Sequence, residues 1–259
     1  NLAHSTQVTY QKILENHILP ALGKVKLTDL THRQVQQFVT SLSVKKKLSA
    51  KTVRNIHGIL HNMLESAIRD ELLLRNVSER CSLPRVTQHQ VRAITTAELS
   101  QFLRAIDGKQ FRNIFFIDIF SGLRLSEILG LRWEDVDFDH DCIYVRQQLQ
   151  QKQVKGDFGY FLAPPKEGKQ RKVILAQNAM RVLRHQRAKQ NEQQLAAGML
   201  WDNSFHLVFT NDFGQPLNRR TVYKHLKRIL LDCGMGNYTF HSLRHSFATI
   251  SLENGDDIK

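Results

Sequence analysis

The chain has 259 residues, of which 41% belong to the hydrophobic set, so it can bury a core and is not disordered throughout. No apolar run approaches the ~20 residues that a membrane helix needs, because Asp118 interrupts the best candidate, 113–120. The formal net charge of +13 favours a polyanionic partner, usually nucleic acid, over a merely basic soluble protein.

The N-terminal residues and the cysteines both bear on the compartment in which the protein works. Residues 1–4 have neither the charged stretch nor the apolar stretch of a signal peptide. The three cysteines, Cys81, Cys142 and Cys233, lie far apart and form neither a disulfide framework nor a CxxC metal pair. Both features fit a reducing cytosol.

The first third is predicted to be helical and is the more basic part of the chain, with a net charge of +8 in residues 1–92. A periodic segment, 5–19, is expected to stop at Pro20. Thr31 and Gln34 have capping-box spacing and open a helix to about Ser41. A third helix begins near Ser49. Its helically spaced apolar residues predict one buried face: Val53, Ile56, Leu60, Met63, Leu64 and Ala67.

Residues 76–93, with Pro84 and no clear periodicity, favour a linker. A new helix is then capped at 95–98, and a second is predicted over 111–120. After Trp133 the pattern changes. Short strands are expected at 142–145, 160–162 and 172–175, and helices at 178–197, 219–231 and 242–252.

Three basic segments of the second part could carry chemistry, and Arg124 lies in the first. It follows Gly122 and begins an apolar helix, where a guanidinium suits an anionic oxygen. Glu127 lies one turn later and could hold Arg124 in place. Taken alone, an arginine near a helix start is more often a surface residue.

The second segment, 165–171, lies between two predicted strands and therefore predicts a β-hairpin tip that carries Lys166. A lysine on a hairpin can reach into a cleft and donate a proton. Most hairpin lysines are only solvated, and Lys169 is the alternative assignment.

The third segment contains His241 and Arg244, whose spacing of three places them on one helix face. That pairing sets a proton-transfer group beside a fixed cation. His241 and His245 could bind a metal together, but neither an HExxH pattern nor a second ligand cluster accompanies them. We therefore predict no metal site.

In this order the three segments resemble the tyrosine recombinase, or phage integrase, family, most closely integrases of conjugative transposons and temperate phages. Gly-Leu-Arg-Leu-Ser-Glu at 122–127 is similar to the family's first arginine motif, and 241–249 to its His-x-x-Arg motif. Lys166 matches the family's β-hairpin lysine. Residues 1–85 resemble its core-type DNA-binding domain, so the resemblance covers nearly the whole chain.

The resemblance implies a mainly α fold with two domains. Residues 1–85 would form the small helical DNA-binding domain and 86–93 the linker. Residues 94–259 would form the catalytic domain, mostly helical with a small antiparallel β-sheet.

The resemblance also implies a chemistry. A tyrosine attacks a DNA phosphodiester, forms a 3′-phosphotyrosine link and releases a 5′-hydroxyl, and strand exchange passes through a four-way junction. The covalent intermediate keeps the bond energy, so neither ATP nor a metal or other cofactor is needed. Arg124 and Arg244 would bind the non-bridging oxygens, Lys166 would protonate the leaving oxygen, and His241 would assist proton transfer. Glu127 would support them.

The implied partner is double-stranded DNA at specific recombination sites, bound by a tetramer of the full-length protein in the bacterial cytoplasm, with the nucleoid. Much of the affinity should be electrostatic and fall with salt. The candidate phosphate contacts are Lys45, Lys46, Lys47, Lys51 and Arg54.

The sequence departs from the family pattern after the His-x-x-Arg motif. The family continues to a Gly-His motif and the nucleophilic tyrosine, and neither follows here. The five tyrosines are Tyr10, Tyr144, Tyr160, Tyr223 and Tyr238. We expect that the C-terminal piece is missing, and that this chain binds DNA without cleaving it by itself.

Three other functions stay open. A DNA-binding module without chemistry explains the charge but not the catalytic order of the residues. A type IB topoisomerase shares the chemistry, although the small helical domain in front favours a recombinase. A metal-dependent nuclease needs clustered carboxylates. The candidates, which more simply form a polar turn, are Asp135, Asp137, Asp139 and Asp141.

Overall fold

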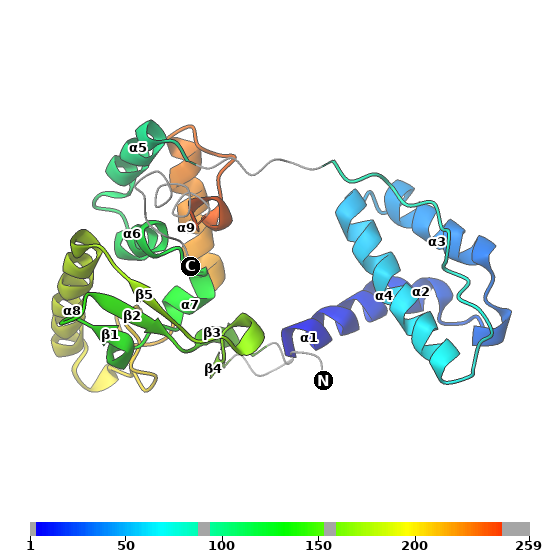
Figure 1. Ribbon diagram of the computed structural model, residues 1–259, viewed down its shortest axis with the longest axis horizontal. Coiled ribbons are helices and arrows are strands. Elements are labelled where there is room, and N and C mark those ends of the chain that lie inside the picture. The colour runs from blue at the N-terminus through cyan, green and yellow to red at the C-terminus, as the bar shows by residue number, and fades with distance from the viewer. Residues whose placement is uncertain (1–3, 88–93, 153–158, 245–259) are drawn as a thin grey trace. The chain divides into compact units, whose positions relative to one another are not determined.

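The computed structural model describes residues 4–87, 94–152 and 159–244 (Figure 1). The chain divides into two compact units, Asn1–His89 and Gln90–Lys259, and each has its own hydrophobic core. Most of the described residues are helical, and their strands, all antiparallel, belong to the second unit. The predicted fold class is therefore confirmed.

The first unit is a small helical bundle. Its elements are α1 (His4–Ile13), the π-helical η1 (Leu14–Ile18), α2 (Leu19–Leu22), the 3₁₀ turn η2 (Leu27–Asp29), α3 (His32–Val44) and α4 (Ala50–Arg69). A full capping box starts α3, because Thr31 and Gln34 each accept a backbone hydrogen bond from the other. Ser49 caps α4 by accepting from the Thr52 amide. Both predicted helix starts are confirmed.

The expected stop at Pro20 is wrong, because helical structure continues through α2 to Leu22. Pro20 lies in the first turn of α2, directly after the π-helical residues of η1. A proline at the start of a helical segment removes an amide that has no regular α-helical partner there, so it is tolerated.

The core of the first unit lies between α3 and α4. Val35, Phe38 and Leu42 of α3 are buried with the predicted face of α4, apart from Met63. Met63 is 43% exposed, and Ile59 is buried in its place. The helical period therefore identified the face, and one flanking position was assigned to the wrong side.

Residues 76–84 form a strap that runs back along α3 and α4, not a loose linker (Figure 1). The Gln36 side chain bonds both backbone groups of Ser82, at 2.7 and 3.2 Å. Arg54 Nε donates to the Pro84 carbonyl at 2.8 Å, and His57 Nε2 lies 3.0 Å from the Ser78 carbonyl. Of the predicted linker 86–93, residues 88–93 lie outside the described residues.

The second unit surrounds a short sheet with helices. The helical elements are α5 (Thr96–Ile106), α6 (Arg112–Ser121), α7 (Leu125–Leu129), η3 (Trp133–Asp135), η4 (Lys166–Gly168), α8 (Gln177–Ala197), η5 (Gly198–Leu200) and α9 (Arg219–Asp232). The strands are β1 (Val136–Asp137), β2 (Cys142–Val145), β3 (Gln148–Gln151), β4 (Tyr160–Ala163) and β5 (Arg171–Ile174). The capping box predicted at 95–98 is present at the start of α5.

The strands form two short antiparallel sheets, in the orders β1-β2-β5 and β3-β4, and β2 to β5 together make an interrupted ribbon. β2 pairs with β5, with Val145 opposite Arg171, and β3 pairs with β4, with Gln148 opposite Ala163. The chain therefore turns between β3 and β4, and residues 164–170 leave the ribbon on one side. The predicted hairpin tip at Lys166 is wrong, because β4 and β5 do not pair with each other in the described part of the chain.

Two glycines fix the position of α7. Gly122 ends α6 in the left-handed conformation, at φ 59°, which turns the chain toward Arg124. Gly130 follows α7, and a Cβ atom there would lie 2.5 Å from the Leu149 backbone nitrogen. The close approach of α7 to β3 therefore requires the second glycine.

Candidate active site

Arg124 occupies the N-cap position of α7, as the sequence predicted for a helix start. Its backbone amide donates to Glu127 Oε2 at 3.0 Å, and its Nη1 donates to Glu127 Oε1 at 2.9 Å. The side chain of Arg124 remains 39% exposed. The guanidinium is thus held from one side and stays accessible to an anion from the other.

Glu127 is the buried centre of the site, because its side chain has no exposed surface. Arg171 Nη2 donates to its Oε2 at 2.6 Å, in addition to the bonds from Arg124. Burial by itself raises the pKa of the Glu127 carboxyl, but the hydrogen bonds from Arg171 and Arg124 outweigh burial and lower that pKa. Glu127 is therefore a carboxylate that bridges two arginines.

Arg171 belongs to this cluster, although we predicted no role for it from the sequence. It begins β5, within the same basic segment as Lys166. The available signal was its place as the first residue after the 164–170 excursion, where a strand begins. Nothing in the sequence alone indicates that this strand end lies beside α7.

Arg244 comes to the same cluster from the far end of the described chain. A reciprocal pair of bonds between Thr239 and Ser242 caps the helical turn that carries it. Burial lowers the pKa of Arg244, and the positive charges of Arg124 and Arg171 lower it further. The buried Nη1 atom of Arg244 has no hydrogen-bond partner within the described residues. The site therefore presents a desolvated donor that an incoming anion can satisfy.

Asp118, in α6, lies close enough to Arg244 for their charges to interact. Its side chain is buried, and neither carboxyl oxygen has a hydrogen-bond partner within the described residues. Burial raises the pKa of Asp118 well above its ordinary value, and the charge of Arg244 opposes that rise only in part. From the sequence we predicted no role for Asp118 beyond the interruption of an apolar run.

His241 lies one turn before Arg244, exposed on the capped helical turn. Its spacing to Arg244 is as predicted, and its part in proton transfer stays a prediction. His245 and the rest of the predicted helix 242–252, beyond Arg244, lie outside the described residues. In the described ranges no group of three or more His, Cys, Asp or Glu side chains could hold a metal ion.

Lys166 lies in η4, within the excursion between β4 and β5, and its side chain is exposed. One end of this excursion contacts β3 and the other end contacts α7. Gln148 donates to the Pro164 carbonyl at 2.8 Å, and Arg171 bonds Glu127. The two ends of the excursion that carries Lys166 are therefore held beside β3 and α7. Lys169, the alternative, is also exposed.

Two of the four carboxylates considered for a nuclease, Asp135 and Asp137, have structural partners. Asp135 is buried and accepts from Arg146 at 3.0 Å, and it also bonds Gln147. Asp137 accepts from the backbone amides of Asp139 and His140 and thereby shapes a turn. The polar-turn interpretation describes these contacts.

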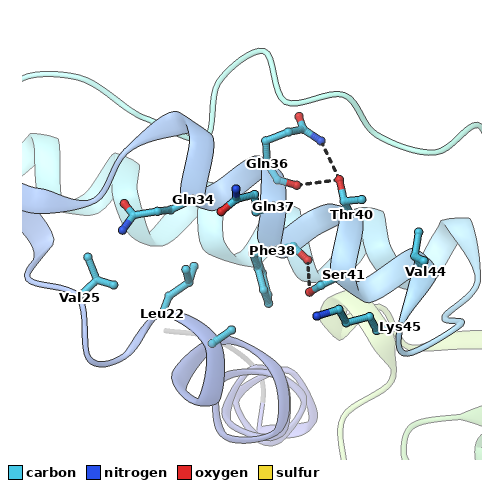
Figure 2. Close-up of a pocket in the computed structure, with 11 residues that line it drawn as sticks. Leu22, Val25, Gln34, Gln36, Gln37, Phe38, Thr40, Ser41, Val44 and Lys45 are labelled. Carbon is cyan, nitrogen blue, oxygen red and sulfur yellow. Dashed lines mark hydrogen bonds between the residues drawn. The ribbon is translucent and has the colours of Figure 1, made fainter.

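The candidate DNA contacts of the first unit are exposed, but they differ in their contacts. Lys46 Nζ donates to the Asn16 carbonyl at 3.1 Å, and Arg54 is bound to Pro84. Lys45 lies at the end of a groove of about 620 Å³ between α2 and α3 (Figure 2). Lys45, Lys47 and Lys51, in contrast, make no side-chain hydrogen bond or ion pair within the described residues of the first unit.

Tyr238, the tyrosine nearest to the third basic segment, is buried, and its hydroxyl donates to the Glu98 carboxylate at 3.0 Å. Glu98 also accepts from Thr95 in the capping box of α5. This contact gives Tyr238 a structural role between α5 and the last described helical turn.

Comparison with known proteins identifies the family to which the sequence is similar. Residues 84–259 match the model of the phage integrase family, and residues 1–43 match that of the phage integrase N-terminal SAM-like domain. A "Tyrosine recombinase XerC-like" protein of Caldanaerobacter subterraneus subsp. tengcongensis is 25% identical, over 98% of this chain and 69% of that protein. The "ICEBs1 integrase" of Bacillus subtilis is 23% identical, over 95% of this chain and 66% of that protein.

Solved structures show the same fold. The Tn1549 transposon integrase, determined in complex with transposon right end DNA, superimposes with a TM-score of 0.82 at 20% identity. That match covers 99% of this chain and 84% of the other. A lambda integrase tetramer bound to a Holliday junction gives a TM-score of 0.71 at 16% identity, over 99% of this chain and 70% of the other.

Proposed function

Because the chain belongs to the phage integrase family, we propose that it forms the DNA-binding and catalytic body of a tyrosine-type site-specific recombinase. The reaction would integrate or excise a mobile element through a 3′-phosphotyrosine intermediate and a four-way junction. The observation that carries the proposal is that Arg124 and Arg244, far apart in the sequence, both lie within electrostatic reach of one buried carboxylate, Glu127.

The arginines suit phosphoryl transfer. The transition state spreads negative charge over the non-bridging oxygens, and guanidinium groups bind such oxygens with directed, charge-assisted hydrogen bonds. The unpartnered Nη1 of Arg244 and the exposed side of Arg124 supply these donors. Arg124 and Arg171 share Glu127, and Arg244 lies within electrostatic reach of all three, so the cluster keeps an excess of positive charge that a phosphate would neutralise.

The remaining roles follow the family pattern. Lys166 would protonate the 5′ leaving oxygen, and His241 would assist proton transfer or orient the phosphate. Glu127 would hold Arg124. The attacking tyrosine is assigned to none of the chain's five tyrosines, and no metal or cofactor takes part in the proposed step.

In this proposal residues 1–85 bind the recombination site as the core-binding domain, 86–93 link the units, and 94–259 form the catalytic domain. The integrase and recombinase relatives suggest that the protein works as a tetramer on two paired sites. The chain spans 62% to 69% of the length of the first three curated relatives it matches, so the assembly of the whole protein is part of the proposal. Action on chromosomal DNA would place it at the bacterial nucleoid, in the cytoplasm. No helix in the described ranges is long and apolar enough to span a membrane.

Arg124→Ala tests the proposal. In the protein expressed from its full reading frame, the variant should lose covalent DNA linkage to a nicked suicide substrate by at least about 100-fold. It should keep its affinity for the same duplex within a few-fold. A DNA-binding module without chemistry predicts no covalent linkage in the wild type and only the change in affinity.

A further inference from the structure

Arg171 shares Glu127 with Arg124. The two nitrogen atoms Nη2 and Nη1 of Arg171 lie 2.6 and 3.3 Å from Oε2 and Oε1 of Glu127. Arg124 approaches the same two oxygens with its backbone amide and Nη1. Glu127 therefore has four donors, two from each arginine.

We propose that Arg171 is a positioning residue for the recombination reaction, which holds the Glu127 carboxylate in the plane that orients Arg124 toward the scissile phosphate. This inference rests on the proposed function, because it assigns Arg171 a task within the same site.

Glu127 is buried and needs more than one compensating cation. A carboxylate with no exposed surface must be compensated by charge and by hydrogen bonds. Arg124 compensates it only from the helix side and has to remain available to an external anion. Arg171 supplies the second cation, so that Arg124 can bind a phosphate without leaving Glu127 alone in the core.

Arg171 is carried by a rigid element, the strand β5 of the sheet. The backbone of Arg171 is paired with Val145 in the β2–β5 ladder, and its guanidinium makes a two-pronged contact. A strand of the sheet therefore fixes one side of Glu127, and α7 fixes the other. Placement on paired, rigid elements is what the orientation of a reactive group requires.

The hydrogen bonds of Arg171 indicate a positioning role and not direct contact with the phosphate. The Nη groups of Arg171 are engaged by Glu127, whereas Arg244 keeps a buried Nη1 atom without a partner in the described residues. Arg171 also contributes to the positive charge that lowers the pKa of Arg244. The bonds assign Arg171 to Glu127, and the open donors belong to Arg124 and Arg244.

Arg171→Gln, Arg171→Lys and Lys172→Gln form the test set. Lys172 is the neighbouring exposed cation, so Lys172→Gln removes the same charge without touching Glu127. In the protein from its full reading frame, Arg171→Gln should slow suicide-substrate cleavage on the order of 10- to 100-fold, with duplex affinity within a few-fold of wild type. Arg171→Lys should recover only part of the rate, because an ammonium cannot make the two-pronged contact. Lys172→Gln should cleave at the wild-type rate.

A double-mutant cycle with Glu127→Gln identifies the route of the effect. If Arg171 acts through Glu127, Arg171→Gln should add less than about 3-fold to the loss caused by Glu127→Gln alone. Full additivity would overturn the proposal in favour of direct phosphate contact by Arg171. Equal losses in Arg171→Gln and Lys172→Gln would overturn it in favour of a general effect of charge.

A spectroscopic readout on the chain itself does not depend on cleavage. The guanidinium NMR signals of Arg124 should show hindered rotation in the wild type and in Lys172→Gln, and free rotation in Arg171→Gln. Unchanged Arg124 signals in a folded Arg171→Gln protein would contradict the inference. Loss of cleavage in Arg124→Ala with those unchanged signals would leave the proposed function standing, so the two failures are distinguishable.

Discussion

Asp118 places a carboxyl group in the apolar core of the second unit, next to the arginine cluster. The pKa of Asp118 is raised above its ordinary value of 3.8 by burial. As pH rises, the unfolded chain therefore releases this proton before the folded chain does. The contribution of Asp118 to stability is complete below pH 3.8 and is lost as pH rises toward the folded-state pKa.

We expect Asp118→Asn to remove this dependence and to stabilise the second unit at pH 8, by about 1–3 kcal/mol. Urea unfolding followed by tryptophan fluorescence measures it, since Trp133 and Trp201 both belong to that unit. At pH 4 the variant and the wild type should differ much less. A variant that is less stable than the wild type by the same amount at both pH values would show that the carboxyl makes a needed contact.

At the same scale, the candidate site could be predicted only in part. The Arg124–Glu127 contact is local, three residues apart on a helix start, so the sequence spacing was enough to predict it. Arg171 and Asp118 belong to the cluster through strand register and core packing, which bring together residues far apart in the chain. No local pattern in the sequence encodes these two contacts.

Among the elements, the strap 76–84 shows how a segment without periodicity can be part of a folded unit. A polar network joins this strap to α4: the side chains of His57 and His61 bond Ser78, which in turn bonds Asn76. Burial lowers the pKa of His57 below its ordinary value of 6.5, which outweighs the favourable bond to the Ser78 carbonyl. The strap is therefore held most firmly when His57 is neutral.

The sign of the resulting pH dependence follows from that shift. Above pH 6.5 the stabilisation is complete, and it is lost as pH falls toward the folded-state pKa, because the unfolded chain binds the proton first. Amide signals of α4 and of the strap in a urea titration should show a less stable first unit at pH 5.5 than at pH 7.5.

His57→Gln is the control, because its amide can donate to Ser78 without titrating. It should cost about 1 kcal/mol at pH 7.5 and reduce the pH dependence. Burial and the charge of Lys46 also lower the pKa of His17 in the same unit, so the remaining pH dependence should decrease further in the double variant His57→Gln, His17→Gln. A first unit equally stable at both pH values would count against a role for His57 protonation.

The elements themselves were predicted where local chemistry decides them. Capping side chains marked the starts of α3, α4 and α5 correctly. The errors at Pro20 and at the hairpin have a common physical reason, since each depended on how a neighbouring element continues. The register of β2 with β5 and of β3 with β4 moves the ribbon turn away from Lys166, and strand pairing of this kind is not written in the strands alone.

On the scale of the whole molecule, the net charge of +13 and the family membership both support DNA as the proposed partner. Charge alone could not separate a recombinase from a simple DNA-binding protein. The arginine cluster supplies the distinction between these two functions. It places three guanidinium groups close to one buried carboxylate, in a unit whose sequence as a whole is only moderately basic.

The salt dependence of duplex binding tests which lysines of the first unit contact phosphates. Each phosphate contact contributes about 0.9 to the slope of log affinity against log salt concentration. Lys45→Gln and Lys47→Gln should each reduce that slope by up to about 0.9, because both side chains are exposed. Lys46→Gln should reduce it less, since Lys46 already donates to the Asn16 carbonyl. Fluorescence anisotropy between about 50 and 300 mM salt measures the slopes. Lys24→Gln is the control, because it removes an equal charge from an exposed site outside the proposed contacts. An equal reduction of the slope in Lys24→Gln would show that residues 45–47 contribute only through the general charge of the unit.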